Sequence, residues 1–234
     1  MPPTYRNPKQ IGGIFIAKLI VTEKPSVAMS YAKVLGVHGR QDGYLEGSGY
    51  IVSWCVGHLV ELAPPSAYGE QYVEWSITDL PILPQKWQYL VSASTKKQFS
   101  VLKKLMHRAD VDTVVNSCDS GREGELIFRL VYQQAGCKKP FSRLWLSSME
   151  ASAIREGFAH LKPSTEYDAL YNAALCRDAL MPTIQSARSR QSAALYSASY
   201  SVDGFRWSNP SRMAFSSMLD SHRREKGFLH PACW

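Results

Sequence analysis

Three carboxylates occur in one short stretch that also holds two glycines. Asp119, Glu123 and Glu125 follow an apolar run rich in β-branched residues and alternate with Gly121 and Gly124. The run predicts a buried strand, the glycines a tight turn, and the apolar spacing that follows predicts the start of a helix. Acids at the carboxyl end of such a strand lie where α/β sheets bind their ligands. Clustered carboxylate oxygens there suit a hard cation such as Mg²⁺.

A purely structural role would also account for these acids. Glu123 and Glu125 would complement the positive end of a helix dipole, and Asp119 would cap the same helix. The stretch alone does not distinguish the two interpretations, so the elements around it must decide.

A second acid follows an earlier strand in the same way. Residues 17–22 are expected to form a strand, Glu23 and Lys24 come directly after it, and a helix is expected over 25–36. Proline favours the first helical position and glycine a helix end, which sets those bounds. If the two strands are neighbours in a parallel sheet, Glu23 and Asp119 meet at one edge.

The remaining pattern alternates strands with helices. Residues 43–54 predict a hairpin, 94–108 a helix with a basic face, and 112–116 the central strand that leads into the acidic turn. A further strand is expected over 141–146, followed by a helix that opens with a capping box over 147–150. The fold class is therefore α/β with a mainly parallel sheet flanked by helices.

Composition limits the kind of protein and its partners. The 234 residues carry a formal net charge of +7 and are 45% hydrophobic, which suits a globular protein with a polyanionic partner, nucleic acid first. No apolar run of about 18 residues predicts a membrane span. No signal peptide is recognised either, and we expect a cytoplasmic protein. The five cysteines lack metal-ligand spacing, and no Gly-x-Gly-x-x-Gly predicts a nucleotide cofactor.

The order of these motifs resembles the Toprim domain, the catalytic domain shared by type IA topoisomerases, some primases and related nucleases. The Toprim pattern places a Glu after the first strand and an Asp-x-Asp-x-Glu cluster after a later one. Leu-Ile-Val-Thr-Glu-Lys-Pro-Ser at 19–26, Gly-His-Leu-Val-Glu-Leu at 57–62 and Cys-Asp-Ser-Gly-Arg-Glu-Gly-Glu at 118–125 are similar to bacterial topoisomerase III. The resemblance covers residues 17–177 and implies a Rossmann-like Toprim fold.

The resemblance also implies roles for individual residues. Glu23, Asp119 and Glu123 would hold Mg²⁺, and Glu23 would also transfer a proton at the 3′ hydroxyl. Lys24 and Arg122 would contact DNA phosphates, although Arg122 could instead pair with Glu23 or Asp119.

Four further side chains have expected roles. Lys97 and Lys104, on the basic face of their helix, are either phosphate contacts or part of a solvated surface. Glu125 is expected to pair with Arg129 one helical turn further on. His58 is expected to be a buried, hydrogen-bonded loop histidine in preference to a DNA contact.

Two departures from the family pattern restrict what the resemblance implies. Gly121 stands where the family often has a second Asp, so weaker metal binding is expected. Past Arg177 the sequence becomes rich in Ser, Arg and Ala, and Tyr196 and Tyr200 lack the motif of the family's nucleophilic tyrosine. No nucleophilic tyrosine is therefore assigned.

These features give an expected domain organisation. An N-terminal extension over 1–16 precedes a Toprim domain over 17–162, the start of a helical region over 163–177, and a poorly ordered, unrelated tail over 178–234. The tail points to a truncated or frameshifted product. The chain would act as a monomer that binds single-stranded DNA and Mg²⁺ but does not relax DNA alone. The alternatives are a stand-alone Toprim nuclease or phosphotransfer protein and a non-catalytic DNA-binding module.

Overall fold

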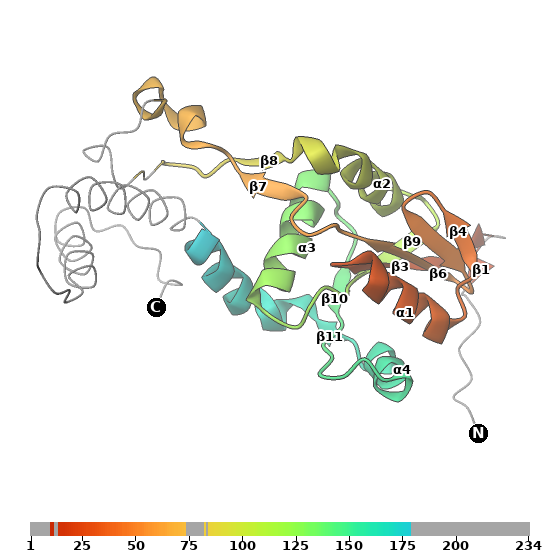
Figure 1. Ribbon diagram of the computed structural model, residues 1–234. Helices are drawn as coiled ribbons and strands as arrows, with labels where there is room; N and C mark the ends of the chain where they lie inside the picture. The colour runs from red at the N-terminus through yellow and green to blue at the C-terminus, as the bar shows by residue number, and fades with distance from the viewer. Residues whose placement is uncertain (1–9, 12–13, 74–81, 83, 179–234) are drawn as a thin grey trace, which may run out of the picture.

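The computed structural model describes residues 10–11, 14–73, 82 and 84–178. Its main element is a 7-stranded sheet in the order β11-β10-β9-β3-β6-β5-β4 (Figure 1). The strands are β3 (Ala17–Thr22), β4 (Gly39–Gln41), β5 (Tyr44–Gly47), β6 (Tyr50–Trp54), β9 (Val111–Asn116), β10 (Phe141–Arg143) and β11 (Lys162–Pro163). The four central strands, β10, β9, β3 and β6, run parallel to one another, and the outer strands pair antiparallel. The expected α/β class with a mainly parallel sheet is confirmed.

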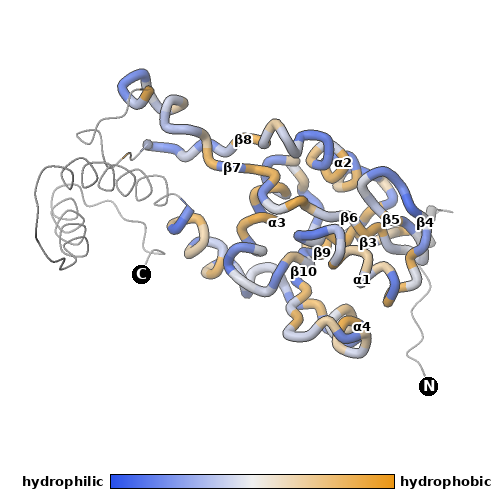
Figure 2. Tube along the Cα trace, viewed as in Figure 1, coloured by the Kyte–Doolittle hydropathy of each residue, from blue (hydrophilic) through white to orange (hydrophobic). Residues whose placement is uncertain are grey.

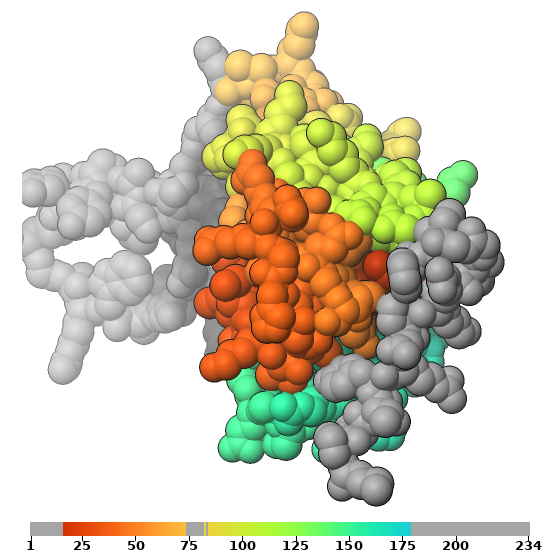
Figure 3. Space-filling view, turned by 90° about the vertical axis from the view of Figure 1, so that its right-hand side faces the viewer, coloured from red at the N-terminus to blue at the C-terminus, as the bar shows by residue number. Residues whose placement is uncertain are grey.

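Helices cover both faces of the sheet. Helices α2 (Lys96–Met106) and α3 (Arg122–Ala135) pack on one face, and α1 (Pro25–Leu35) and α4 (Ala151–Ala159) on the other. A space-filling view from the side of β4 agrees with this arrangement, because the orange segment of β4 to β6 lies between the yellow-green segment of α2 and the green segment of α4 (Figure 3).

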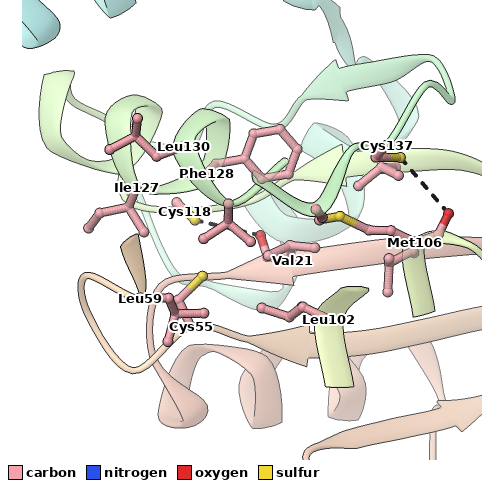
Figure 4. Packing of buried hydrophobic residues seen from close by; sticks show 14 of the residues in the cluster. Val21, Cys55, Leu59, Leu102, Met106, Cys118, Ile127, Phe128, Leu130 and Cys137 are labelled. Carbon is pink, nitrogen blue, oxygen red and sulfur yellow. Dashed lines mark hydrogen bonds between the residues drawn. The ribbon is translucent and has the colours of Figure 1, made fainter. Parts of the chain in front are cut away.

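Alternation along β3 explains why two cores form. Leu19 and Val21 face the cluster under α2 and α3, whereas Ile20 faces the cluster under α1. Since both faces of a central parallel strand are buried, its sequence is almost continuously apolar. The first cluster joins Val21 of β3 to side chains of α2 and α3, including Leu102 and Phe128 (Figure 4). Hydropathy along the trace shows β3 as largely orange and the outer strand β4 as blue (Figure 2).

Shorter elements complete the described chain. They are the pairs β1 (Gln10–Ile11) with β2 (Ile14–Phe15) and β7 (Val60–Leu62) with β8 (Tyr89–Val91), and the 3-10 turns η1 (Pro65–Tyr68), η2 (Glu70–Tyr72), η4 (Ala93–Thr95) and η5 (Ser164–Tyr167). Residues 168–178 are helical. None of the described helices has the length and apolar character needed to cross a bilayer. The tail expected over 178–234 lies outside the described residues except for its first position.

Several expected elements are confirmed in position, but the strand expected over 141–146 ends at Arg143 and the start of one predicted helix is wrong. The hairpin forms from β5 and β6, and α1 begins at Pro25 and ends with Gly36 in the left-handed region, at φ 71°. Helix α4, however, has Glu150 as its N-cap and no side-chain cap, so the capping box predicted over 147–150 is absent. The Ser148 hydroxyl instead accepts a hydrogen bond from the Glu150 backbone N–H.

Candidate active site

The side chain of Lys24 joins the two strand ends that carry the acids. Its Nζ lies 3.1 Å from Asp119 Oδ2 and 3.4 Å from Glu23 Oε1. The hydrogen bond to Asp119, with the nearby charge of Glu23, raises the pKa of Lys24 above its ordinary value. The strand register produces this meeting, because β9 and β3 are parallel neighbours with Val21 opposite Asn116.

Asp119 does not cap the following helix. The N-cap of α3 is Gly121, and no side chain caps the helix there. The carboxylate of Asp119 is half-exposed and directed to Lys24, so the structural interpretation of this residue is wrong. Glu123 and Glu125 do lie in the first turn of α3, where the helix dipole favours negative charge.

Glu123 is held by a histidine from a different loop. Its Oε1 lies 2.6 Å from His58 Nε2, and both side chains are partly exposed. His58 is therefore hydrogen-bonded as expected, although it is not buried. Within the described ranges, no group of three or more His, Cys, Asp or Glu side chains is arranged to hold a metal ion.

Glu125 belongs to the buried interior. It is 0% exposed and accepts hydrogen bonds from Arg129 Nε at 2.7 Å and Asn116 Nδ2 at 3.0 Å. The expected pair with Arg129 is confirmed. Arg129 also reaches Asp168 and the carbonyl of Ser164, so Glu125 ties the start of α3 to the region after β11.

One buried cation next to this turn was not predicted from the sequence. Arg143, the last residue of β10, is 0% exposed. Its guanidinium donates hydrogen bonds to the backbone carbonyls of Asn116, Cys118 and Asp119. The signal that could have revealed it is a single arginine among the apolar residues of the strand predicted over 141–146.

The other predicted cations lie on the surface. Arg122 is exposed at the start of α3, and no ion pair joins it to Glu23 or Asp119 in the described chain. Lys97 pairs with Asp42 at 2.9 Å with both side chains largely exposed, and Lys104 is exposed on α2.

The donor set at the strand ends fits Mg²⁺. Glu23 and Asp119 contribute carboxylate oxygens on both sides of one ammonium group, so the place between them already accommodates positive charge. Mg²⁺ is bound in proteins by one or two carboxylates while it keeps several waters. Glu23 and Asp119 supply two such carboxylates, whereas Gly121 supplies none and Glu123 is paired with His58.

Comparison with known proteins agrees with this architecture. Residues 18–149, more than half of the chain, match the Toprim domain family. The chain is 47% identical over 160 residues to "DNA topoisomerase 3" of Shouchella clausii, covering 68% of this chain and 22% of that relative. It is 45% identical over 159 residues to "DNA topoisomerase 3" of Bacillus subtilis, with the same two coverages.

A solved structure is also similar. Full-length topoisomerase I from Thermotoga maritima aligns with a TM-score of 0.47 at 22% identity, over 69% of this chain and 23% of that one. The chain thus spans about a fifth of the length of these topoisomerases. The chain belongs to the Toprim domain family, and its Toprim domain is similar to that of bacterial DNA topoisomerase 3.

Proposed function

We propose that this chain supplies the Mg²⁺-binding and phosphate-orienting part of a type IA topoisomerase that acts on single-stranded DNA. The observation that carries the proposal is the bridge from Glu23 through Lys24 to Asp119. Two acids and a lysine at the carboxyl ends of adjacent parallel strands form a place where a phosphate and its counter-charge can be held together.

Each of these side chains has a distinct part in the proposal. Glu23 and Asp119 would hold Mg²⁺, with Glu123 nearby in the first turn of α3, and the bound ion would offset phosphate charge. Lys24 contributes a compact positive charge to a DNA phosphate oxygen. Glu23, whose side chain is only 12% exposed, transfers a proton at the 3′ hydroxyl that is released on cleavage and consumed on religation.

Exposed cations provide the sequence-independent part of DNA binding. Arg122 stands beside the acidic turn and Lys104 on the surface of α2, and both are exposed. Lys97 is engaged by Asp42 at the surface, and such exposed pairs are weak enough to exchange for a phosphate. These contacts would make affinity fall with added salt.

Cleavage also needs a nucleophilic hydroxyl, and Tyr31 is unsuited to that role. The residue is 4% exposed, burial raises its pKa to about 12, and its hydroxyl donates a hydrogen bond to Met149 Sδ at 3.9 Å. Tyr196 and Tyr200 lack the motif of the family's nucleophile, so we propose that a tyrosine from another chain serves the acids and that the 234-residue chain does not relax DNA alone.

A magnesium titration tests the binding proposal. The wild-type chain should bind Mg²⁺ more tightly with a single-stranded oligonucleotide present, and Asp119→Asn should lose most of that binding. Equal Mg²⁺ affinity in the two proteins would contradict the assignment.

A plasmid assay tests the reaction. Relaxation of supercoiled DNA by the purified chain would contradict the requirement for an outside tyrosine. Metal-dependent nicking that Glu23→Gln abolishes would identify a stand-alone Toprim nuclease instead.

A further inference from the structure

The guanidinium of Arg143 binds the backbone of the acidic turn from inside the protein. Nη1 donates to the carbonyl oxygens of Asn116 at 3.1 Å and Cys118 at 2.8 Å, and Nη2 donates to that of Asp119 at 2.7 Å. Nη1 also lies 3.2 Å from the Asn116 side-chain oxygen. These three carbonyls lie within four consecutive residues, so one side chain fixes the course of the chain up to Asp119.

The charge of Arg143 is balanced next to the turn. Its Nε lies 3.0 Å from Glu125 Oε2, with both residues fully buried. This contact is ionic only, because the Nε makes no hydrogen bond of proper geometry within the described chain. A buried charge is tolerated when it is paired and its other polar atoms are satisfied. Glu125 itself is held by Arg129 and Asn116, so the balancing carboxylate is fixed as well.

Aromatic rings restrict the guanidinium further. Its central carbon lies 5.2 Å from the centre of the Trp145 ring and 6.0 Å from that of Tyr167, and those two rings stack on each other with centroids 5.0 Å apart. A planar, rigid guanidinium can satisfy several carbonyls and aromatic neighbours at once, which the single ammonium of a lysine cannot do.

We propose that Arg143 is a positioning residue that holds the Asp119 carboxylate in place opposite Lys24 and Glu23. The expected effect of Arg143 on Mg²⁺ binding rests on the proposed function, since the positioned carboxylate is the one assigned to Mg²⁺. The geometry is independent of the proposed function, because the hydrogen bonds of Arg143 are present in the structure without metal. Residues behind metal ligands commonly change metal affinity by about 10- to 100-fold when altered.

The test uses Arg143→Lys in the full chain, with Arg108→Lys as a matched control. Arg108 is also an arginine in an ion-pair network, with Glu46 and Asp110, but it lies at the opposite end of β9. Two properties are measured: Mg²⁺ affinity, and hydrogen exchange at the amides of Gly121 and Glu125, whose hydrogen bonds close the turn.

Arg143→Lys should weaken Mg²⁺ binding by roughly 10- to 100-fold and speed exchange at those two amides. Strand β3 should remain protected, and Arg108→Lys should change neither property. Unchanged exchange at the turn in a folded Arg143→Lys protein would overturn the proposal, as would unchanged Mg²⁺ affinity.

The two proposals fail in different ways. If the wild-type chain binds no Mg²⁺, the proposed function fails, and exchange at Gly121 and Glu125 alone decides the role of Arg143. If Arg143→Lys does not fold, Glu125→Gln replaces it, because that change removes the balancing charge and leaves the shape almost unaltered. Faster exchange at the turn in Glu125→Gln supports the proposal, and wild-type exchange there overturns it.

Discussion

The α-carbon of Gly124 lies against the backbone of Asp119. A β-carbon on Gly124 would come 2.2 Å from the Asp119 carbonyl oxygen and 2.8 Å from its nitrogen, closer than nonbonded atoms can approach. Gly121 differs, because its backbone is extended at φ −178° and a β-carbon there would meet nothing within 4 Å. The first glycine of the turn is therefore replaceable, whereas the second lets helix α3 begin directly beneath the acid.

Gly124→Ala should displace Asp119 and weaken Mg²⁺ binding, with an overpacking cost of about 1–3 kcal/mol in the free energy of unfolding. Gly121→Ala is the matched control, because it adds the same methyl group in open space. Calorimetric Mg²⁺ titration and urea unfolding of both variants check this. Equal behaviour of the two alanine variants would contradict the role given to Gly124.

The charged residues of the site differ in how well sequence predicts them. Glu23 and Asp119 were predictable because Glu23 directly follows β3 and Asp119 comes three residues after the end of β9, and parallel strands bring such positions to one edge. The bridge through Lys24 depends on strand order, with β3 beside β9, which local pattern does not encode. Arg143 was missed because its partners are mainly backbone carbonyls, and a carbonyl has no residue type to recognise.

Two other sequence patterns, the predicted capping box and the pair of glutamates at the start of α3, did not determine the structure by themselves. The spacing of Ser147 and Glu150 satisfies a capping box, yet the helix begins later, with Glu150 as its N-cap. Glu123 and Glu125 look alike in sequence, but the first is largely exposed and paired with His58 and the second is 0% exposed. Only the rotation of α3 against the sheet separates a surface acid from a buried one.

This difference between the two glutamates predicts losses of stability of different size when each is replaced by alanine. Glu125→Ala leaves Arg143 and Arg129 without their shared carboxylate, and breaking such a buried pair costs about 3–5 kcal/mol. Glu123→Ala removes a partly exposed contact, so its cost should stay within about 1 kcal/mol. Urea unfolding at neutral pH measures both, and a similar loss in the two variants would contradict the burial of Glu125.

Acid should weaken the ion-pair network at the other end of β9. The hydrogen bond from Arg108 lowers the pKa of Asp110 below its ordinary value of 3.8. Because the folded-state pKa is depressed, this contribution is fully present above that ordinary value and is lost as pH falls through the folded pKa. Unfolding free energies of wild type and Asp110→Asn should differ at neutral pH and converge in strong acid. A constant difference across the acid range would contradict the prediction.

Removing the bridging cation should change DNA binding more than removing a distant one. Lys24→Gln should lower affinity for a single-stranded oligonucleotide and reduce the slope of log affinity against log salt by about 1. Lys33→Gln is the control, since Lys33 lies in the last turn of the same helix and the charge change is identical. Fluorescence anisotropy over a salt series measures both slopes. Equal slopes in the two variants would show that Lys24 does not contact a DNA phosphate.

A carboxylate placed at Gly121 should strengthen metal binding. A β-carbon at this position would meet nothing within 4 Å, and the extended backbone accepts any residue, so Gly121→Asp should fold normally and add an oxygen ligand beside Asp119. Gly121→Asn is the matched control, because Asp and Asn cap a helix about equally well and only the charge differs. Mg²⁺ titration should show tighter binding for Gly121→Asp than for wild type and Gly121→Asn. If Gly121→Asn binds Mg²⁺ as tightly as Gly121→Asp, the gain comes from the helix cap, and the number of carboxylates in the turn does not limit its Mg²⁺ affinity.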